Sequence, residues 1–506
     1  MFENQPKGLF ALALANTGER FGYYTMLAIF VLFLQSNFGW NEGLAGTVYS
    51  TFLMLVYFLP IVGGAAADKI GFGRCVTIGI VVMFLGYLLM AVPAGSGVPA
   101  VAIMVAALLM ISIGTSLFKG NLQVMVGKLY DDARYAGQRD SGFSIFYMAI
   151  NIGALFAPTA ALKLMAWART SLHASEQTAY HYAFGVACVS LVISIAIYYG
   201  FRRTFAHVDN TAAKATATVK ADEAKPETAE DKADTRSRLV ALFLVFAVVI
   251  FFWMAFHQNG LTLTYFARDF TQTSATGWTA MLFDVTNVVA VIVNIYAAVA
   301  AFQSKTVRGR TIAALVIIAS ACFIGYKYGA LMADGGSVEV SAPIFQQFNP
   351  AFVVGLTPLS MALFGWLAAR GKEPSAPRKI GYGMLVAGAG YVVMILASVG
   401  LSYTLTDEQR VSPMWLVSTY LVLTFAELLL SPMGISFVSK VAPQKYQGVM
   451  MGCWFGATAI GNFLVQIPAY LWKALPLTMV WSVLVALCLA SFVFIFSMMK
   501  KLEKVC

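Results

Sequence analysis

Apolar stretches of about 20 residues recur along the whole chain, and each is long enough to cross a bilayer as a helix. Inside lipid, a helix satisfies all of its own backbone N–H and C=O groups, so runs of this length are expected to be helical. The 506 residues are 59% hydrophobic and only 11% charged, which excludes an ordinary soluble protein. The pattern therefore predicts an all-α integral membrane protein.

The apolar runs predict about 14 transmembrane helices. They fall at 9–35, 43–67, 74–95, 100–127, 140–165, 179–201, 238–267, 278–302, 311–332, 344–369, 380–402, 413–437, 446–472 and 476–499. The segment 204–237 separates the sixth helix from the seventh. It is rich in Ala, Lys, Glu, Asp and Thr, a composition typical of a solvated and disordered linker.

Basic residues lie mainly in the loops on one side of the predicted helices. If the N-terminus is cytoplasmic, loops on the opposite side hold only Arg169, Arg268, Arg410 and Lys473 of the 34 Lys and Arg residues. By the positive-inside rule, this predicts a multi-pass protein of the plasma (inner) membrane with both termini cytoplasmic. The net charge of +10 is then explained by contact with membrane lipid, and no nucleic-acid partner is expected.

Six motifs follow one another in both halves of the chain. They are ERFGYY at 19–24, FKGN at 118–121, FSIFYMAINIG at 143–153, QFNP at 347–350, AELLLSPMG at 426–434, and GCWFG at 452–456 with Gly461-Asn462. In this order they resemble motifs of the proton-dependent oligopeptide transporter (POT) family. The segment 63–74 also resembles the loop signature of the major facilitator superfamily, to which that family belongs.

The resemblance implies a major facilitator fold with two six-helix bundles and an extra helix pair. We expect an N-terminal bundle at 1–203, a disordered cytoplasmic linker at 204–237 and a C-terminal bundle at 238–506, with the inserted pair at about 278–332. The implied function is secondary active import of di- and tripeptides by alternating access, coupled to protons. Small peptides and protons would then be the partners.

Charged side chains inside the predicted helices support the same assignment. An ionised group is costly in a membrane helix unless it faces a wet cavity and finds a partner. Arg20 and Lys119 suit the carboxylate of a peptide, whereas Glu427 suits its ammonium group. The predicted substrate-binding residues are Arg20, Tyr23, Tyr24, Tyr57, Lys119, Asn151, Asn349, Glu427 and Trp454, and the predicted proton-coupling or gating residues are Glu19, Arg20, Lys119, His257, Gln258 and Glu427. The alternative is that the charges form fixed ion pairs that only fasten helices together.

Three positions depart from the family pattern. Asn16 and His257 stand where the family has glutamates, and Leu27 stands where it has an arginine. The resemblance implies that the missing arginine and the second glutamate pair across the extracellular gate. Because both are absent here, we expect the gate to close by packing and hydrogen bonds involving His257 and Gln258. His257 is also a candidate titrating group, since an imidazole has an unperturbed pKa of about 6.5.

Other functions remain open at this point. A transporter of nitrate or another small solute, an uncoupled peptide facilitator and a receptor are the alternatives. No enzyme is expected, because the chain contains neither an H-E-x-x-H motif nor a phosphate-binding G-x-x-x-x-G-K-[ST] loop. No metal site and no cofactor are predicted. Asp284, in the first helix of the extra pair, is predicted to serve helix packing or lipid contact rather than transport.

Overall fold

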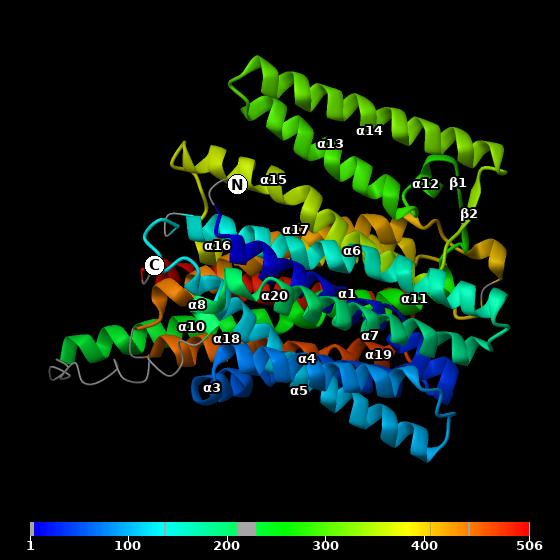
Figure 1. Cartoon of the computed structure of the whole chain (residues 1–506), viewed down its shortest axis with the longest axis horizontal. Helices are drawn as coiled ribbons and strands as arrows, with labels where there is room; N and C mark the ends of the chain where they lie inside the picture. The colour runs from blue at the N-terminus through cyan, green and yellow to red at the C-terminus, as the bar shows by residue number, and fades with distance from the viewer. Residues whose placement is uncertain (1–4, 136–137, 210–228, 405, 444–445, 505–506) are drawn as a thin grey trace. The chain divides into compact units, whose positions relative to one another are not determined.

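The computed structural model describes residues 5–135, 138–209, 229–404, 406–443 and 446–504. Within these ranges, 14 helices are long and apolar enough to span a membrane, in agreement with the number expected from the sequence. Figure 1 shows the helices as long ribbons joined by short loops. Among the described residues, the exception to an all-α structure is one small antiparallel pair of strands, β1 (Ser274–Thr276) and β2 (Ser337–Glu339).

The chain divides into two compact units, and the first consists of Met1–His257, Ile435–Tyr470 and Ser497–Cys506. Its elements are α1 (Lys7–Phe38), α2 (Glu42–Phe58), α3 (Pro60–Ile70), α4 (Phe72–Ala91), α5 (Val98–Lys128), α6 (Arg139–Ser171), α7 (Glu176–Gly200), η2 (Arg202–Thr204), α8 (Ala206–Asp209), α10 (Ala229–Phe256), α18 (Gln447–Leu464), α19 (Gln466–Leu471, up to Tyr470) and α21 (Met499–Glu503). In this unit, α1 packs against α6 and α7, while α18 packs against α2 and α10.

The second unit consists of Gln258–Gly434 and Leu471–Phe496. Its elements are η3 (His257–Gly260, from Gln258), α11 (Thr262–Phe270), the two strands, α12 (Gly277–Met281), α13 (Val285–Gln303), α14 (Val307–Ala333), η4 (Ala342–Gln347), α15 (Phe348–Ala368), α16 (Ala376–Ala397), η5 (Asp407–Gln409), α17 (Met414–Val441, up to Gly434) and α20 (Leu477–Ser497, up to Phe496). Figure 1 shows α13 and α14 as a helical hairpin in green.

Glycines allow neighbouring helices of the first unit to approach closely. A Cβ on Gly79 of α4 would lie 2.7 Å from the carbonyl oxygen of Gly114 on α5, and a Cβ on Gly114 would lie 2.6 Å from that of Gly79. Distances below 3.0 Å leave no room for a side chain. Backbone contact of this kind is a usual way for helices to associate in lipid, where burial of apolar surface contributes little.

The helix predicted at 238–267 is interrupted. The α10 helix ends at Phe256, a 3₁₀ turn follows, and α11 begins at Thr262. The Asn259 carbonyl at this break accepts hydrogen bonds from the hydroxyls of Thr264 (3.0 Å) and Tyr420 (2.8 Å). A helix break is tolerated at membrane depth when side chains satisfy the released backbone groups.

Both ends of the predicted linker at 204–237 are helical in the structure. Thr204 ends η2, α8 follows to Asp209, and α10 begins at Ala229. Asp209 is buried and accepts a 2.8 Å hydrogen bond from Nη2 of Arg202, which holds the first end in place. At the other end the segment is mostly polar, but it contains Ala, Glu and Lys, which have high helix propensity. Residues 210–228, the remainder of the predicted linker, lie outside the described residues.

The two compact units do not follow the order of the chain, since α10 and α18 belong to the same unit as the N-terminal helices. The two compact units are defined by contacts in the structure, whereas the two predicted bundles are defined by the order of helices along the chain, and these are different criteria. The division into bundles at 1–203 and 238–506, with an inserted pair at about 278–332, therefore stays a prediction.

Candidate functional site

Two charged neighbours in α1 form a buried ion pair. Glu19 is 0% and Arg20 2% exposed. Nε of Arg20 donates to Oε2 of Glu19 and Nη2 donates to Oε1, each over 2.5 Å. The guanidinium also lies 4.6 Å from the ring centre of Tyr23. A bidentate pair of this kind is a strong interaction, and here it joins two residues of the same helix.

A second cation lies on α5. Nζ of Lys119 sits 4.3 Å from the centre of the Tyr57 ring of α2, a cation–π contact. Directly after α10, at the start of η3, the ring of His257 lies 6.0 Å from that of Tyr57 and stacks on Trp253 of α10 at 5.1 Å. Lys119, Tyr57 and His257, predicted separately and placed on α5, α2 and η3, therefore form one cluster in the first unit.

The other predicted residues of the first unit lie on α1, α6 and α18. Tyr24 meets Tyr23 edge to face at 5.1 Å. Asn151 is 7% exposed, and its Nδ2 donates to the carbonyl of Tyr147 one turn earlier, so this N–H is used within α6. Trp454 is 3% exposed and packs at 6.2 Å against Phe246 of α10.

Asn16, which stands in place of the family's glutamate, is also buried in α1 and is 2% exposed. An amide at this position adds no negative charge beside Arg20. The carboxylate that pairs with Arg20 in the structure is that of Glu19.

In the second unit, Asn349 and Glu427 form a polar pair. Nδ2 of Asn349, on α15, donates to Oε2 of Glu427 on α17 over 2.9 Å and lies 3.1 Å from Oγ1 of Thr424. Glu427 is 7% exposed. Gln258 is fully buried in the same unit, and its Oε1 accepts a 2.7 Å hydrogen bond from Thr262.

Of the two roles predicted for Asp284, helix packing and lipid contact, the structure shows contacts of the packing kind. Its Oδ1 accepts a 2.9 Å hydrogen bond from the backbone N–H of Thr286 and caps the start of α13. Its Oδ2 lies 2.6 Å from Nζ of Lys327 on α14. The carboxylate therefore fastens the two helices of the hairpin together.

Sequence reasoning did not single out the side chains of Trp253 and Asn462 for a role. Asn462 on α18 is fully buried and lies near His257. The signal was present in the Gly461-Asn462 motif, but the sequence does not say which helix this pair faces.

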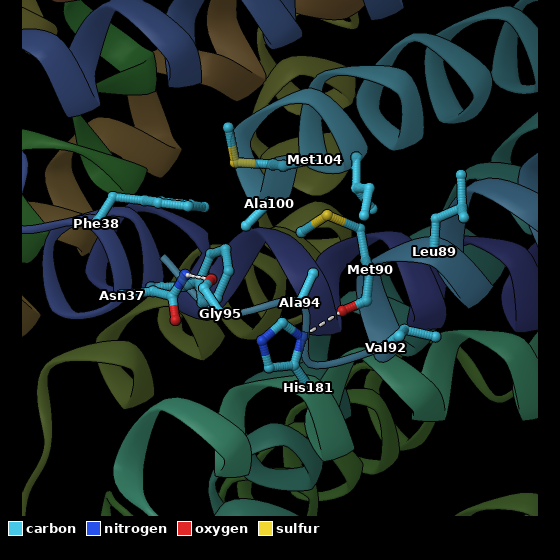
Figure 2. A pocket seen from close by; sticks show the side chains of 12 residues that line it. Asn37, Phe38, Leu89, Met90, Val92, Ala94, Gly95, Ala100, Met104 and His181 are labelled. Carbon is cyan, nitrogen blue, oxygen red and sulfur yellow. Dashed lines mark hydrogen bonds between the residues drawn. The ribbon is translucent and has the colours of Figure 1, made fainter. Parts of the chain in front are cut away.

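A separate small pocket lies where α1, α4, α5 and α7 end or begin, and Figure 2 shows its lining. Nδ1 of His181 lies 2.7 Å from the carbonyl oxygen of Met90, and Nδ2 of Asn37 donates to the carbonyl of Gly95 over 2.9 Å. The first contact is to the last turn of α4 and the second to the loop between α4 and α5, and the remaining lining is largely apolar. Packing explains this pocket. Among the described residues, no three His, Cys, Asp or Glu side chains gather as a metal site would require.

Membrane-length helices that keep buried ion pairs and polar clusters are typical of transport proteins. A sequence model of the POT family matches residues 74–221 and 322–480, together more than half of the chain. The chain belongs to the POT family.

Curated relatives are similar to the chain along most of its length. A di-/tripeptide transporter of Lactococcus lactis subsp. lactis (strain IL1403) is 29% identical over 485 residues, covering 90% of this chain and 87% of the relative. The uncharacterized transporter YclF of Bacillus subtilis (strain 168) is 29% identical over 504 residues, covering 94% and 90%.

Solved structures share the fold. A crystal structure of the peptide transporter POT in complex with sulfate has a TM-score of 0.74 at 24% identity, and the match covers 100% of this chain and 96% of the other. A POT family transporter in complex with 5-aminolevulinic acid has a TM-score of 0.73 at 21% identity, covering 99% and 98%. The predicted family and fold class are confirmed.

Proposed function

We propose that the chain is a secondary active transporter that imports di- and tripeptides by alternating access, driven by a proton gradient. Membership of the POT family supports this proposal, and so do the names of relatives that match nearly the whole chain, among them the di-/tripeptide transporter of Lactococcus lactis and the peptide transporter YePEPT of Yersinia enterocolitica. No chemical step is assigned to the chain, which moves its substrate unchanged.

The observation that carries the proposal is the partner of Arg20. Because Glu19 is its sequence neighbour on α1, this buried ion pair fastens no two helices together. Desolvation of two charges is costly, so a pair without a packing role calls for another use. Lys119 adds a second cation close enough to act electrostatically on both residues. When Lys119 is protonated, the first unit's charge cluster has one positive charge in excess.

A peptide carboxylate is the natural anion for this excess charge. We assign it to Arg20 and Lys119, with the aromatic rings of Tyr23, Tyr24, Tyr57 and Trp454 accepting varied side chains. The ammonium group is assigned to Glu427, which Asn349 already orients by a hydrogen bond, with the Oδ1 of Asn151 as a further acceptor.

Proton coupling is assigned to Glu19 and His257, with Arg20, Lys119 and Glu427 responding to their charge. Glu19 holds Arg20 when ionised, and a proton on Glu19 would free Arg20 for the substrate. His257 belongs to the same cluster through Tyr57. Gln258 is assigned to gating, since it follows the helix break after Phe256.

The test is uptake of labelled dialanine into proteoliposomes under an imposed pH gradient, with and without a protonophore, beside competition by nitrate. We expect accumulation that requires the gradient and is unaffected by nitrate. A matched His257→Gln variant should flatten the pH profile of uptake while counterflow of peptide continues. Accumulation that ignores the gradient would make the chain an uncoupled facilitator, and binding without transport would make it a receptor.

A nitrate or small-anion transporter is the second candidate. The excess positive charge of Arg20 and Lys119 over Glu19 favours it, because an inorganic anion also satisfies that excess. Glu427 opposes it. Strong nitrate competition together with unchanged uptake in Glu427→Gln would favour this candidate.

The orientation and location of the chain are part of the proposal. The excess of Lys and Arg in alternate loops supports a plasma (inner) membrane protein with both termini cytoplasmic. Cysteine labelling at each terminus in intact and permeabilised cells tests this orientation.

A further inference from the structure

The structure of the first unit explains why glycine precedes asparagine in the Gly461-Asn462 motif of α18. A Cβ on Gly461 would lie 2.4 Å from the carbonyl oxygen of Ile250 and 2.9 Å from Cβ of Trp253, both on α10. Only glycine lets the two backbones meet at this distance. The close approach brings the next residue, Asn462, into the interior of the unit beside His257.

Four polar atoms in this contact have unmet hydrogen-bonding capacity. They are Nε1 of Trp253, Nδ1 of His257, and both Nδ2 and Oδ1 of Asn462; all four are buried, and none makes a hydrogen bond of ordinary length and angle to a described residue, although the Asn462 amide lies close enough to the His257 ring to act on it. Buried polar atoms in folded proteins are nearly always paired with protein or water. Three neighbouring side chains with the same deficit therefore indicate a shared polar occupant.

Water is the occupant that fits this set of atoms. An indole N–H only donates, an amide both donates and accepts, and Nδ1 of an imidazole does either according to its protonation state. A bridging water reverses its own donor and acceptor roles without moving, so it serves both states of the ring. Buried waters typically have two to four such partners.

One charged side chain, several rings and an amide surround His257, and they come from different helices. From α5, Lys119 acts on it electrostatically. From α2, the Tyr57 ring contacts both that lysine, at 4.3 Å, and the imidazole, at 6.0 Å. From α10, Trp253 and Phe256 contribute rings, at 5.1 and 5.5 Å. From α18, Asn462 contributes the amide that a protonated imidazole needs as its acceptor.

We propose that Asn462 is a positioning residue for His257: through a water shared with Trp253, its amide oxygen stabilises the protonated imidazole and so sets the pH at which the transporter takes up its proton. The inference rests on the coupling role proposed for His257. Asn462 itself touches neither substrate nor proton. It acts by orienting the ring that does.

The experiment uses Asn462→Leu, which keeps the size of the side chain and removes its hydrogen bonds. Gradient-driven dialanine uptake in proteoliposomes is measured from pH 5 to pH 8, beside peptide counterflow. We expect the midpoint of the uptake profile to move about 0.5 to 1 pH unit toward lower pH, the size that one hydrogen bond to one protonation state produces. Counterflow should stay within about twofold, because exchange needs no net proton movement.

Three further variants separate positioning from packing. Asn462→Ser, which keeps a hydroxyl and leaves room for water, should restore the midpoint at least in part. His257→Gln with Asn462→Leu should behave as His257→Gln alone, since a residue acting through His257 has no effect without it. Asn294→Leu on α13 is the matched control, because its amide oxygen is also buried and unpaired, and it should leave the profile unchanged.

The outcomes distinguish the inference from the function on which it rests. If His257→Gln alters the profile and Asn462→Leu overlays the wild type, the positioning role of Asn462 is wrong and His257 keeps its role. If His257→Gln itself leaves the profile unchanged, the coupling role fails first. If the Asn462→Leu protein cannot be reconstituted into liposomes, Asn462→Ala is used instead. The same shift of the uptake midpoint is expected, and a profile that overlays the wild type would again show that the positioning role is wrong.

Discussion

The Glu19–Arg20 pair of α1 and the Asp284–Lys327 pair of the α13–α14 hairpin are both ion pairs at the membrane-spanning helices, but they differ in exposure and in what they join. The side chains of the first pair are 0% and 3% exposed, and those of the second 35% and 31%. The first pair lies within one helix, whereas the second connects two. Whether an ion pair has a structural role therefore depends on which helices it connects.

The difference matters because desolvation costs the first pair far more than the second. Asp284 and Lys327 keep part of their hydration and gain a helix contact. Glu19 and Arg20 lose theirs and gain no helix contact from each other. A third charge, Lys119, acts electrostatically on both members of the first pair, which makes that cluster responsive to an anionic ligand.

Arg20→Gln should have the largest effect. It leaves the Glu19 carboxylate buried without its cation, which costs about 3–5 kcal/mol of stability, and it removes the proposed carboxylate ligand. We expect loss of dialanine uptake and a lowered melting temperature in detergent. The control is Glu19→Gln with Arg20→Gln, which removes both charges and should recover the melting temperature but not the uptake. Recovered uptake in that double variant would show that the pair is only structural.

Glu427→Gln should have the next largest effect on transport. Glutamine keeps an oxygen that accepts from Asn349, so the fold should be preserved while the charge for the peptide ammonium is lost. A hydrogen bond to a charged group contributes about 1.5–3 kcal/mol, which predicts a reduction in dialanine uptake of roughly 10- to 100-fold. Competition by N-acetyl-dialanine, which has no ammonium group, should change little. Equal losses of affinity for both peptides would contradict the assignment.

Tyr57→Leu tests the ring that contacts both Lys119 and His257. A cation–π contact contributes about 0.5–2 kcal/mol, so uptake should fall by roughly 2- to 30-fold. Tyr57→Phe keeps the ring face and is the matched control, expected to retain most of the uptake. If the two variants lose uptake equally, the hydroxyl rather than the ring face is what matters.

Asp284→Asn should have the smallest effect. A partly exposed ion pair contributes at most about 1 kcal/mol, so thermal stability should fall slightly and uptake should stay within about twofold. Loss of uptake in Asp284→Asn would show that the Asp284–Lys327 pair is also needed for transport, contrary to the difference drawn between the two ion pairs.

The pH dependence of this small effect has a defined sign. Burial raises the pKa of Asp284, but hydrogen bonds from Lys327 and Thr286 outweigh burial and hold it below its usual value. Its contribution is therefore complete above the unfolded pKa of about 3.9 and is lost as the pH falls through the lower folded value. Melting temperatures of wild type and Asp284→Asn should differ at pH 7 and pH 5, and the difference should shrink at pH 3.

Much of the fold was predictable because hydrophobicity acts locally. The long apolar runs and the buried positions of Glu19, Arg20 and Glu427 follow from composition over about 20 residues. The motifs around those charges led to the family before any contact was known. The helix break after Phe256 was not predictable in the same way, because hydroxyls of Thr264 and Tyr420 satisfy the released Asn259 carbonyl, and Tyr420 is far away in the sequence.

The sequence by itself determined that the chain crosses a membrane many times and keeps a few charges among its helices. Only the tertiary structure decided which partner each charge has: Arg20 its own neighbour, Lys119 the ring of Tyr57, and Asp284 a lysine on the next helix. Helix formation in lipid is imposed by the backbone within a short window of residues. Side-chain partners depend on how distant helices pack, and a linear pattern carries no record of that packing.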